Sequence, residues 1–377
     1  MRLLDRYLLR ELLLPLAYCL LGFLISFIAF DLFSSIAEFQ KNSLSAADIA
    51  EYYLDRTPEF LVTSFVVPMS LLLALLYSLT NHARHHELTA MRAAAIPLWR
   101  ITLPYFAVGL IFSVAVAWVN ERLVPDGVEA AARVMTRHAT GQPSRAAKKI
   151  QDPEVNFHND AANRIWRIGA YHLQNNTMIR PHFEWTHPDG SHMTLDAEGA
   201  RWFRRHWVFT NASRLAYPAG AAQLPDILKT NQLIVPGLTE TPRIIRSEIK
   251  INAVGDRLRS LRRSQFSSAE ILDYLRLHPD LERDRSDFLR TMLHGRLATP
   301  WICLVVVLIA VPFGSLPGRR NVFVGVASSV FICFAFFVMK EFALAFGSNG
   351  TVPAWLAAWS PNIVFSVTGL VLMWRAR

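Results

Sequence analysis

The chain has 377 residues, of which 52% are hydrophobic and only 18% are charged. Soluble domains rarely reach this balance, which favours a membrane protein and excludes a disordered chain, a collagen-like chain and a disulfide scaffold. The net charge is +9, but basic residues in membrane proteins more often set topology and contact anionic headgroups than bind nucleic acid. The positions of the charges therefore decide the class.

Six stretches lack Asp, Glu, Lys and Arg, and each is long enough to cross a bilayer as a helix. They are residues 12–30, 60–80, 101–120, 297–318, 321–339 and about 355–374. One charged side chain at the bilayer centre costs about 2.5–3.5 kcal/mol, so six such gaps are not accidental. The first run is too long for a cleaved signal peptide, and we expect it to be a retained helix.

Lys and Arg are unevenly distributed between the two sides of the predicted helices. Three lie in the short connections on one side, namely Lys41, Arg56 and Lys340. Ten lie on the other: Arg2, Arg6, Arg10, Arg84, Arg92, Arg100, Arg319, Arg320, Arg375 and Arg377. Because basic residues stay in the cytoplasm, both termini are predicted to be cytoplasmic and residues 124–296 to form a large external domain.

The insert 124–296 alternates apolar and polar residues, as at Trp166, Ile168 and Ala170. Turn signals separate the alternating runs, at Asn175-Asn176, Pro188-Asp189-Gly190 and Pro218-Ala219-Gly220. This pattern predicts antiparallel β structure with one buried face. The cysteines, Cys19, Cys303 and Cys333, fall in predicted membrane helices, so we expect no disulfide in this domain. The cluster Arg201, Arg204 and Arg205 is interpreted as a solvated outer face.

After residue 264 the apolar residues recur at the spacing of a helix. Ser267 and Glu270 fit a capping box, and Ile271, Leu272 and Leu275 follow as an apolar stripe. We therefore predict a helical return segment over 267–296. The sequence thus predicts an α-helical membrane protein with six transmembrane helices, three and three, around an external antiparallel β domain. The first three helices lie in 1–123, the β domain with its helical return in 124–296, and the last three helices in 297–377.

The longest cytoplasmic connection is 81–100. A helix over 84–95, ended by Pro97, places Glu87, Met91 and Ala94 on one face, with Leu88 beside them. Such a helix can take up mechanical input from a soluble motor, or it can simply lie on lipid. His82 and His86 stand four residues apart but match no zinc pattern, so solvated histidines are expected rather than a metal site.

No sequence motif provides catalysis. There is no phosphate-binding glycine loop and no arguable Ser/His/Asp or Cys/His set, although a carboxylate-pair enzyme stays open. We predict no catalytic residues, no cofactor and no metal, so that any ATP must be hydrolysed by a partner. Five cations, Lys41, Arg56, Arg122, Arg296 and Lys340, are predicted at the outer membrane edge. They either snorkel and pair, with Asp31 the acid expected to be buried, or bind a phosphorylated headgroup.

Several short stretches, in this order, carry a family resemblance. They are Leu4-Asp5-Arg6-Tyr7, Glu87-Leu88-Thr89-Ala90-Met91-Arg92, Asn120-Glu121 with Val124-Pro125, Arg296-Leu297-Ala298 with Pro300, and Val311-Pro312-Phe313. With its three-plus-three topology, the chain resembles over its whole length the LptF/LptG permeases of the lipopolysaccharide-export ABC transporter. The family commonly has Gly after the Met-Arg pair, where this chain has Ala95.

The resemblance implies a non-catalytic permease subunit in the bacterial inner membrane. It implies a heterodimer with a paralogous six-span permease, a cytoplasmic ATPase dimer that supplies the energy, and a periplasmic β-jellyroll that passes lipopolysaccharide to a jellyroll bridge protein. The coupling helix against the ATPase would include Arg84, Glu87, Leu88, Met91 and Arg92. The start of the chain leans toward the G-type partner, but the choice between the two types stays open.

Two other classes of function stay open at this point. The first is a membrane-embedded enzyme that modifies an envelope lipid, with a catalytic external domain. The second is an anchor or sensor whose β domain binds a partner. Co-purification with an ATPase and a second six-span protein would distinguish the transporter from both.

Overall fold

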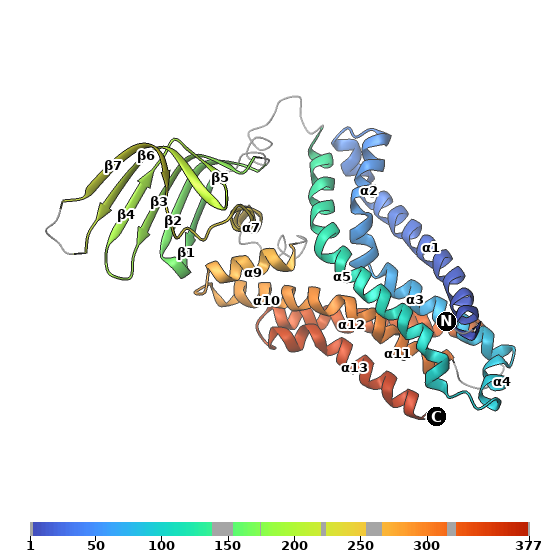
Figure 1. The fold of residues 1–377 in the computed structure, drawn as a ribbon. Helices are drawn as coiled ribbons and strands as arrows, with labels where there is room; N and C mark the ends of the chain where they lie inside the picture. The colour runs from blue at the N-terminus through green and yellow to red at the C-terminus, as the bar shows by residue number, and fades with distance from the viewer. Residues whose placement is uncertain are drawn as a thin grey trace. The chain divides into compact units, whose positions relative to one another are not determined.

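The computed structural model describes residues 3–137, 154–173, 175–219, 224–253, 266–314 and 322–375. Arg2, Arg319, Arg320 and Arg377, used in the orientation prediction, lie outside these residues, as do Gly220 and part of the predicted helical stretches. The chain divides into two compact units, Met1–Ala139 with Asp287–Arg377, and Thr140–Ser286. We call them the membrane unit and the β unit and describe each separately (Figure 1).

The membrane unit is helical throughout its described part. Its elements are α1 (Leu3–Lys41), α2 (Ala46–Val62), α3 (Val66–Arg84), α4 (Glu87–Ala93), α5 (Leu98–Arg137), α10 (Arg283–Ala298, which begins in the β unit), the 3-10 turn η2 (Thr299–Trp301), α11 (Ile302–Gly314), α12 (Val322–Ser348) and α13 (Ala354–Arg375). In the described residues, six helical segments are long and apolar enough to span a membrane, with α10, η2 and α11 together forming the fourth. The prediction of six membrane helices is confirmed.

The second predicted run, 60–80, is divided between two helices. α2 ends at Val62 and α3 begins at Val66, because Phe65 adopts a left-handed conformation with φ of 61° that no α-helix continues. α2 begins with a capping box in which Ser45 and Asp48 bond each other's backbone. The second candidate span is therefore Val66–Arg84, and α2 is a separate helix that packs on α1 and α5.

Two helices form the centre of the membrane unit. Most of α3 and of the α10–α11 segment is buried, with Leu71, Leu75 and Val307 fully so. At Gly314 a Cβ atom would lie 2.5 Å from that of Leu79, so α11 and α3 cross too closely there for a larger residue. In contrast, only 11% of the apolar window of α1 and of α12 is buried. These two helices therefore leave most of their apolar surface uncovered by the residues that the structure describes.

The β unit contains an antiparallel sheet, as the alternating pattern predicts. Its seven strands are β1 (Val155–Asn159), β2 (Arg164–His172), β3 (Thr177–Thr186), β4 (His192–Asp196), β5 (Gly199–Phe203), β6 (His206–Tyr217) and β7 (Asp226–Ile234). The order is β1-β2-β3-β4-β6-β5, with β7 paired to β6 and β3 also paired to β5. One face buries Trp166, Phe183 and Phe209, and Ile245 of α7 (Pro242–Ala253) packs into the same core.

A buried ion pair fixes the segment after β7 to this core. Nε of Arg164 lies 2.9 Å from Glu240 Oε1, and the two side chains are 1% and 0% exposed. Arg164 also donates to Gly237 O and Thr239 Oγ1, while Trp207 donates to the backbone oxygen of Glu240. Near α9 (Ser268–Leu277), the predicted capping box of Ser267 and Glu270 is present. The cap is thus present as predicted, but a helix that the sequence analysis does not predict, α7, already lies between the sheet and Ser267.

Candidate functional site

The candidate coupling site lies where α3, α4 and the starts of α1 and α5 meet. The sequence predicts one helix over 84–95, but Arg84 is the last residue of α3 and α4 spans only Glu87–Ala93. The reason is His86, whose φ of 60° is left-handed. His residues enter this region more easily than most, because their polar side chain compensates locally. The chain therefore bends sharply between α3 and α4.

The other end of α4 has a defined cap. Ile96 N donates to Met91 O and Ala95 N donates to Arg92 O, which is the bond pattern of a Schellman cap. Ala95 occupies its left-handed position, with φ of 57°, where glycine is the usual residue. Met91 and Ile96 both pack against the apolar core of the membrane unit. Each end of α4 is thus set by one left-handed residue, which fixes its direction.

Glu87, the first residue of α4, contacts two other helices. Tyr7 Oη of α1 lies 3.0 and 3.1 Å from its two carboxylate oxygens, and His82 Nδ1 of α3 lies 2.7 Å from Oε2. His82 is 1% exposed, whereas the Glu87 side chain is 34% exposed. The prediction that His82 is a solvated histidine is therefore wrong. Its ring packs beside that of Tyr7, with 5.6 Å between the ring centres. We call Tyr7, His82 and Glu87 the Glu87 clasp.

A second polar contact joins α1 to α5 close to the clasp. The two terminal guanidinium nitrogens of Arg100, Nη1 and Nη2, donate to the two carboxylate oxygens of Asp5, at 2.8 and 2.9 Å. This two-bond geometry is among the stronger ion-pair arrangements, and both side chains are largely shielded from solvent. Two of the stretches that carry the family resemblance, Leu4–Tyr7 and Glu87–Arg92, therefore meet in space.

The remaining predicted coupling residues form two groups, one packed into the core of the membrane unit and one exposed on α4 and at the end of α3. Leu88 is 6% exposed and packs with Met91 into the core of the membrane unit, so these side chains do not present an apolar surface to a partner. Arg84 and Arg92 are exposed, as are Thr89, Ala90 and Ala93. The surface that α4 offers is therefore small and polar, with basic residues at its edges and the partly exposed Glu87 at its start.

Arg56, one of the five predicted outer-edge cations, has partners within the protein. Arg56 of α2 lies 2.8 Å from Glu59 and 3.4 Å from Asp31, and its guanidinium packs over the rings of Tyr52 and Phe60. Burial lowers the pKa of Arg56, but the hydrogen bond and charge of Glu59 outweigh it and leave the pKa raised. Asp31 is half-buried, and it also accepts a hydrogen bond from Tyr53.

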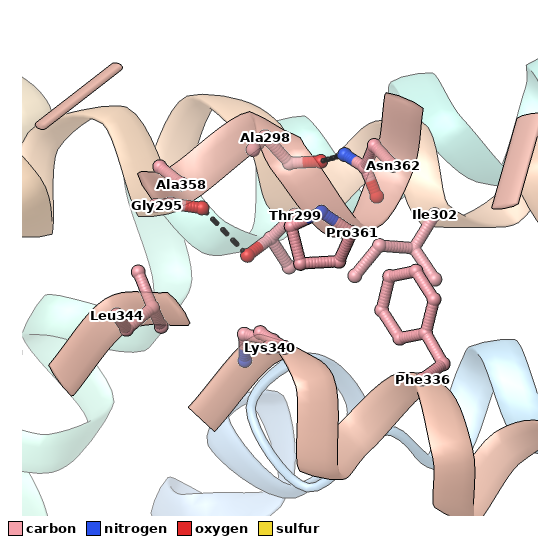
Figure 2. A pocket seen from close by; sticks show the side chains of 10 residues that line it. All are labelled: Gly295, Ala298, Thr299, Ile302, Phe336, Lys340, Leu344, Ala358, Pro361 and Asn362. Carbon is pink, nitrogen blue, oxygen red and sulfur yellow. Dashed lines mark hydrogen bonds between the residues drawn. The ribbon is translucent and has the colours of Figure 1, made fainter. Parts of the chain in front are cut away.

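Arg296 and Lys340 also face the protein. Arg296 is buried and donates to Asn120 O, while the Asn120 amide donates back to Arg296 O, which joins α10 to α5. The ammonium of Lys340 lies 4.4 Å from the ring centre of Phe65. Its side chain lines a cavity of about 10 Å³, room for one water molecule, together with Thr299 and Asn362 (Figure 2).

Lys41 at the end of α1 and Arg122 in α5 are exposed. The five cations are thus unequal: Arg56 and Arg296 hold helices together, Lys340 points into a small cavity, and Lys41 and Arg122 face outward. A headgroup site formed by all five stays a prediction.

Sequence reasoning missed Tyr7, Asp5 and Arg100 as members of the coupling site. In the sequence, Tyr7 and Asp5 stand out only as part of a motif, and Arg100 only as a basic residue on the cytoplasmic side. The available signal was the motif itself, because a polar residue at the start of a membrane helix needs a partner. Its partner is 80 residues away for Tyr7 and 95 for Asp5, so only the folded chain shows the pairing.

These features define a multi-pass membrane protein with a β domain inserted between its third and fourth spans. The family model described as lipopolysaccharide export system permease LptF/LptG matches residues 6–375. The match covers nearly the whole chain, and the chain belongs to this family of transporter permeases. A comparison with curated proteins gives no match. Membership implies a transport subunit rather than an enzyme.

Proposed function

We propose that the chain is a permease subunit of an ABC transporter that extracts lipopolysaccharide from the bacterial inner membrane and passes it to a periplasmic bridge protein. A separate cytoplasmic ATPase dimer supplies the energy, and a paralogous six-span permease completes the pore. Family membership supports the transport role, and the sequence has no nucleotide-binding glycine loop of its own. The observation that carries the coupling mechanism is the Glu87 clasp.

Extraction of such a lipid requires external work. Each buried methylene contributes about 0.8 kcal/mol to keeping an acyl chain in the bilayer, so a lipid with several chains does not leave unaided. A push on α4 by the ATPase reaches α1 through the contact between Tyr7 and Glu87, and the Asp5–Arg100 pair carries the motion from α1 to α5. Three of the six spans then move together, because the bonds link their ends directly.

The second permease is proposed to pack against α1 and α12. Both helices leave most of their apolar window exposed, whereas α3 and the α10–α11 segment are largely covered by this chain. An even number of spans places both termini on one side, and the excess of Arg near α4 favours the cytoplasm for that side. The β unit is then periplasmic.

For the headgroup we propose a smaller basic set than the five cations. Lys41 and Arg122 are exposed, so these two are accessible to a phosphate, whereas the cavity beside Lys340 is too small for one. Arg56 and Arg296 act on the site indirectly, by holding α2 to α1 and α10 to α5. Reversing Lys41 and Arg122 together should lower crosslinking of lipopolysaccharide to photo-probes placed beside them.

The test of the function is co-purification followed by turnover. Expression with its native membrane partners should yield a complex containing an ATPase and a second six-span permease. In that complex Tyr7→Phe removes only one hydroxyl, so assembly should persist while lipid-stimulated ATP hydrolysis falls. Tyr77→Phe, a matched change on a partly exposed side chain of α3, should have no effect. Isolation of the chain without an ATPase would refute the proposal, and full turnover by Tyr7→Phe would refute the clasp mechanism alone.

A further inference from the structure

The hairpin between β5 and β6 ends in an unusual turn. Phe203 pairs with His206 across a two-residue loop, Arg204-Arg205, and both arginines have positive φ, 47° and 69°. Turns of this type favour Asn-Gly, because both central residues are left-handed. Two arginines keep a backbone strain that the favoured pair would relieve. Such strain concentrates at functional positions, so the tip needs an explanation other than folding.

The tip is strongly basic and lacks acidic neighbours. Residues 199–209 contain Arg201, Arg204 and Arg205 and no Asp or Glu. All three arginines are exposed, and within the described residues none of them forms an ion pair. The acid just before this stretch, Glu198, already accepts a hydrogen bond of 2.6 Å from Asn211. The positive charge of the tip is therefore available to an anionic surface.

An exposed aromatic ring lies among these charges. Phe203 is 53% exposed, and the guanidinium carbons of Arg201 and Arg204 lie 6.0 and 5.3 Å from its ring centre. Apolar rings flanked by cations are typical of segments at the membrane–water interface, where the ring enters the headgroup layer and the cations bind phosphates.

The core of the β unit holds this tip in place. Trp202 packs edge-on against Trp207 at 5.1 Å, and Trp207 is 1% exposed and donates to Glu240 O.

We propose that this tip, Arg201 to Arg205, docks on the anionic phospholipid surface of the membrane that the chain spans. Phe203 enters the headgroup layer, and the three arginines bind lipid phosphates. The contact restrains the β unit near the bilayer. It requires no ATPase coupling and is independent of the proposed transport cycle.

A position-specific photo-crosslinker tests the docking. Benzoylphenylalanine replaces Phe203 in the full chain, reconstituted in nanodiscs of phosphatidylcholine with or without phosphatidylglycerol. A second protein carries the probe at Ile227, which is 58% exposed on β7 and pairs with Leu215 toward the opposite sheet end. Phospholipid adducts are expected at 203 well above those at 227, dependent on phosphatidylglycerol and reduced by salt.

A turn variant separates binding from folding. Arg204→Asn with Arg205→Gly installs the favoured turn pair, so the hairpin should be at least as stable in hydrogen exchange while phospholipid adducts fall by roughly 25-fold, since each arginine near an anionic surface contributes about fivefold. Arg167→Gln on β2, also exposed, is the control and should leave adducts unchanged. The proposal would be overturned by equal adducts at 203 and 227, by adducts that do not depend on phosphatidylglycerol, or by adducts that form only when lipopolysaccharide is added.

Discussion

Ala95 shows how one side chain sets the local energy of the coupling site. It holds the left-handed position of a Schellman cap with φ of 57°, where a Cβ atom clashes with the backbone. Glycine would adopt this conformation without the steric cost, so the cap itself favours glycine at position 95.

Ala95→Gly should therefore stabilise the chain by about 1 kcal/mol, because glycine adopts this conformation without the steric cost. The measurement is thermal unfolding of the detergent-solubilised full chain. Ala93→Gly, two residues earlier in the helical part of α4, is the control and should destabilise by about 0.5–1 kcal/mol. Equal effects from the two changes would contradict the role assigned to the cap.

Arg164 is the corresponding residue in the β unit. Its removal leaves Glu240 charged, fully buried and without its cation. Arg164→Met should therefore cost about 3–5 kcal/mol, measured by hydrogen exchange of the β2 and β6 amides. Arg167→Met, three residues later and 62% exposed, should stay within about 0.5 kcal/mol of the native protein. A small effect of Arg164→Met would mean that water reaches this pair.

Among elements, α9 is attached to its surroundings through a histidine. His278, just after α9, has Nδ1 3.0 Å from Asp160 of η1 (Asp160–Ala162) and Nε2 2.8 Å from Glu248 of α7. Burial lowers the pKa of His278, but the hydrogen bonds and charges of Glu248 and Asp160 outweigh it, so the pKa is raised. The ring also packs 4.6 Å from that of Tyr274. The three elements are thus joined best when His278 is protonated.

The attachment of α9 should consequently depend on pH. The pKa of His278 in the folded chain lies above its unfolded value of about 6.5. The stabilisation is therefore complete below a pH of about 6.5 and is lost as the pH rises through the folded-state pKa of His278. Hydrogen exchange of α9, corrected for its intrinsic pH dependence, should show more opening at high pH. His278→Gln should remove this dependence, and an unchanged profile in the variant would assign it to other groups.

The limits of sequence reasoning are clearest at the scale of elements. Hydropathy located all six spans, because a bilayer requires about 20 apolar residues whatever the tertiary contacts. Hydropathy predicts one helix over 60–80 and another over 84–95, since Phe65 and Ala95 carry no sequence signal for a left-handed backbone and His86 carries only a weak one. Glycine would have given that signal. The β alternation and the Ser267 cap are local patterns and were predicted correctly.

For the whole molecule, the proposed motion depends on bonds between distant parts of the chain. Asp5 and Arg100 join the first and third spans, and the Glu87 clasp joins α4 to the first. A rigid connection of this kind predicts that the identity of the two charges matters less than their pairing.

A charge exchange tests this connection in the assembled transporter. Asp5→Arg or Arg100→Asp alone should lower lipid-stimulated ATP hydrolysis roughly tenfold, because hydrogen bonds between charged groups contribute about 1.5–3 kcal/mol. The double exchange should recover much of the loss, as an interacting pair requires. Independent, additive losses would show that the pair does not transmit the motion.

The sequence by itself determined the membrane class, the number of spans, the antiparallel β insert and the family, because hydropathy, period and short motifs are local properties of the chain. Only the tertiary structure decided which polar residues act together. It paired Tyr7 and His82 with Glu87, placed Leu88 inside rather than on a docking surface, and assigned Arg56 and Arg296 to helix packing. The physical reason is that burial and hydrogen bonding depend on neighbours that lie tens of residues away in sequence.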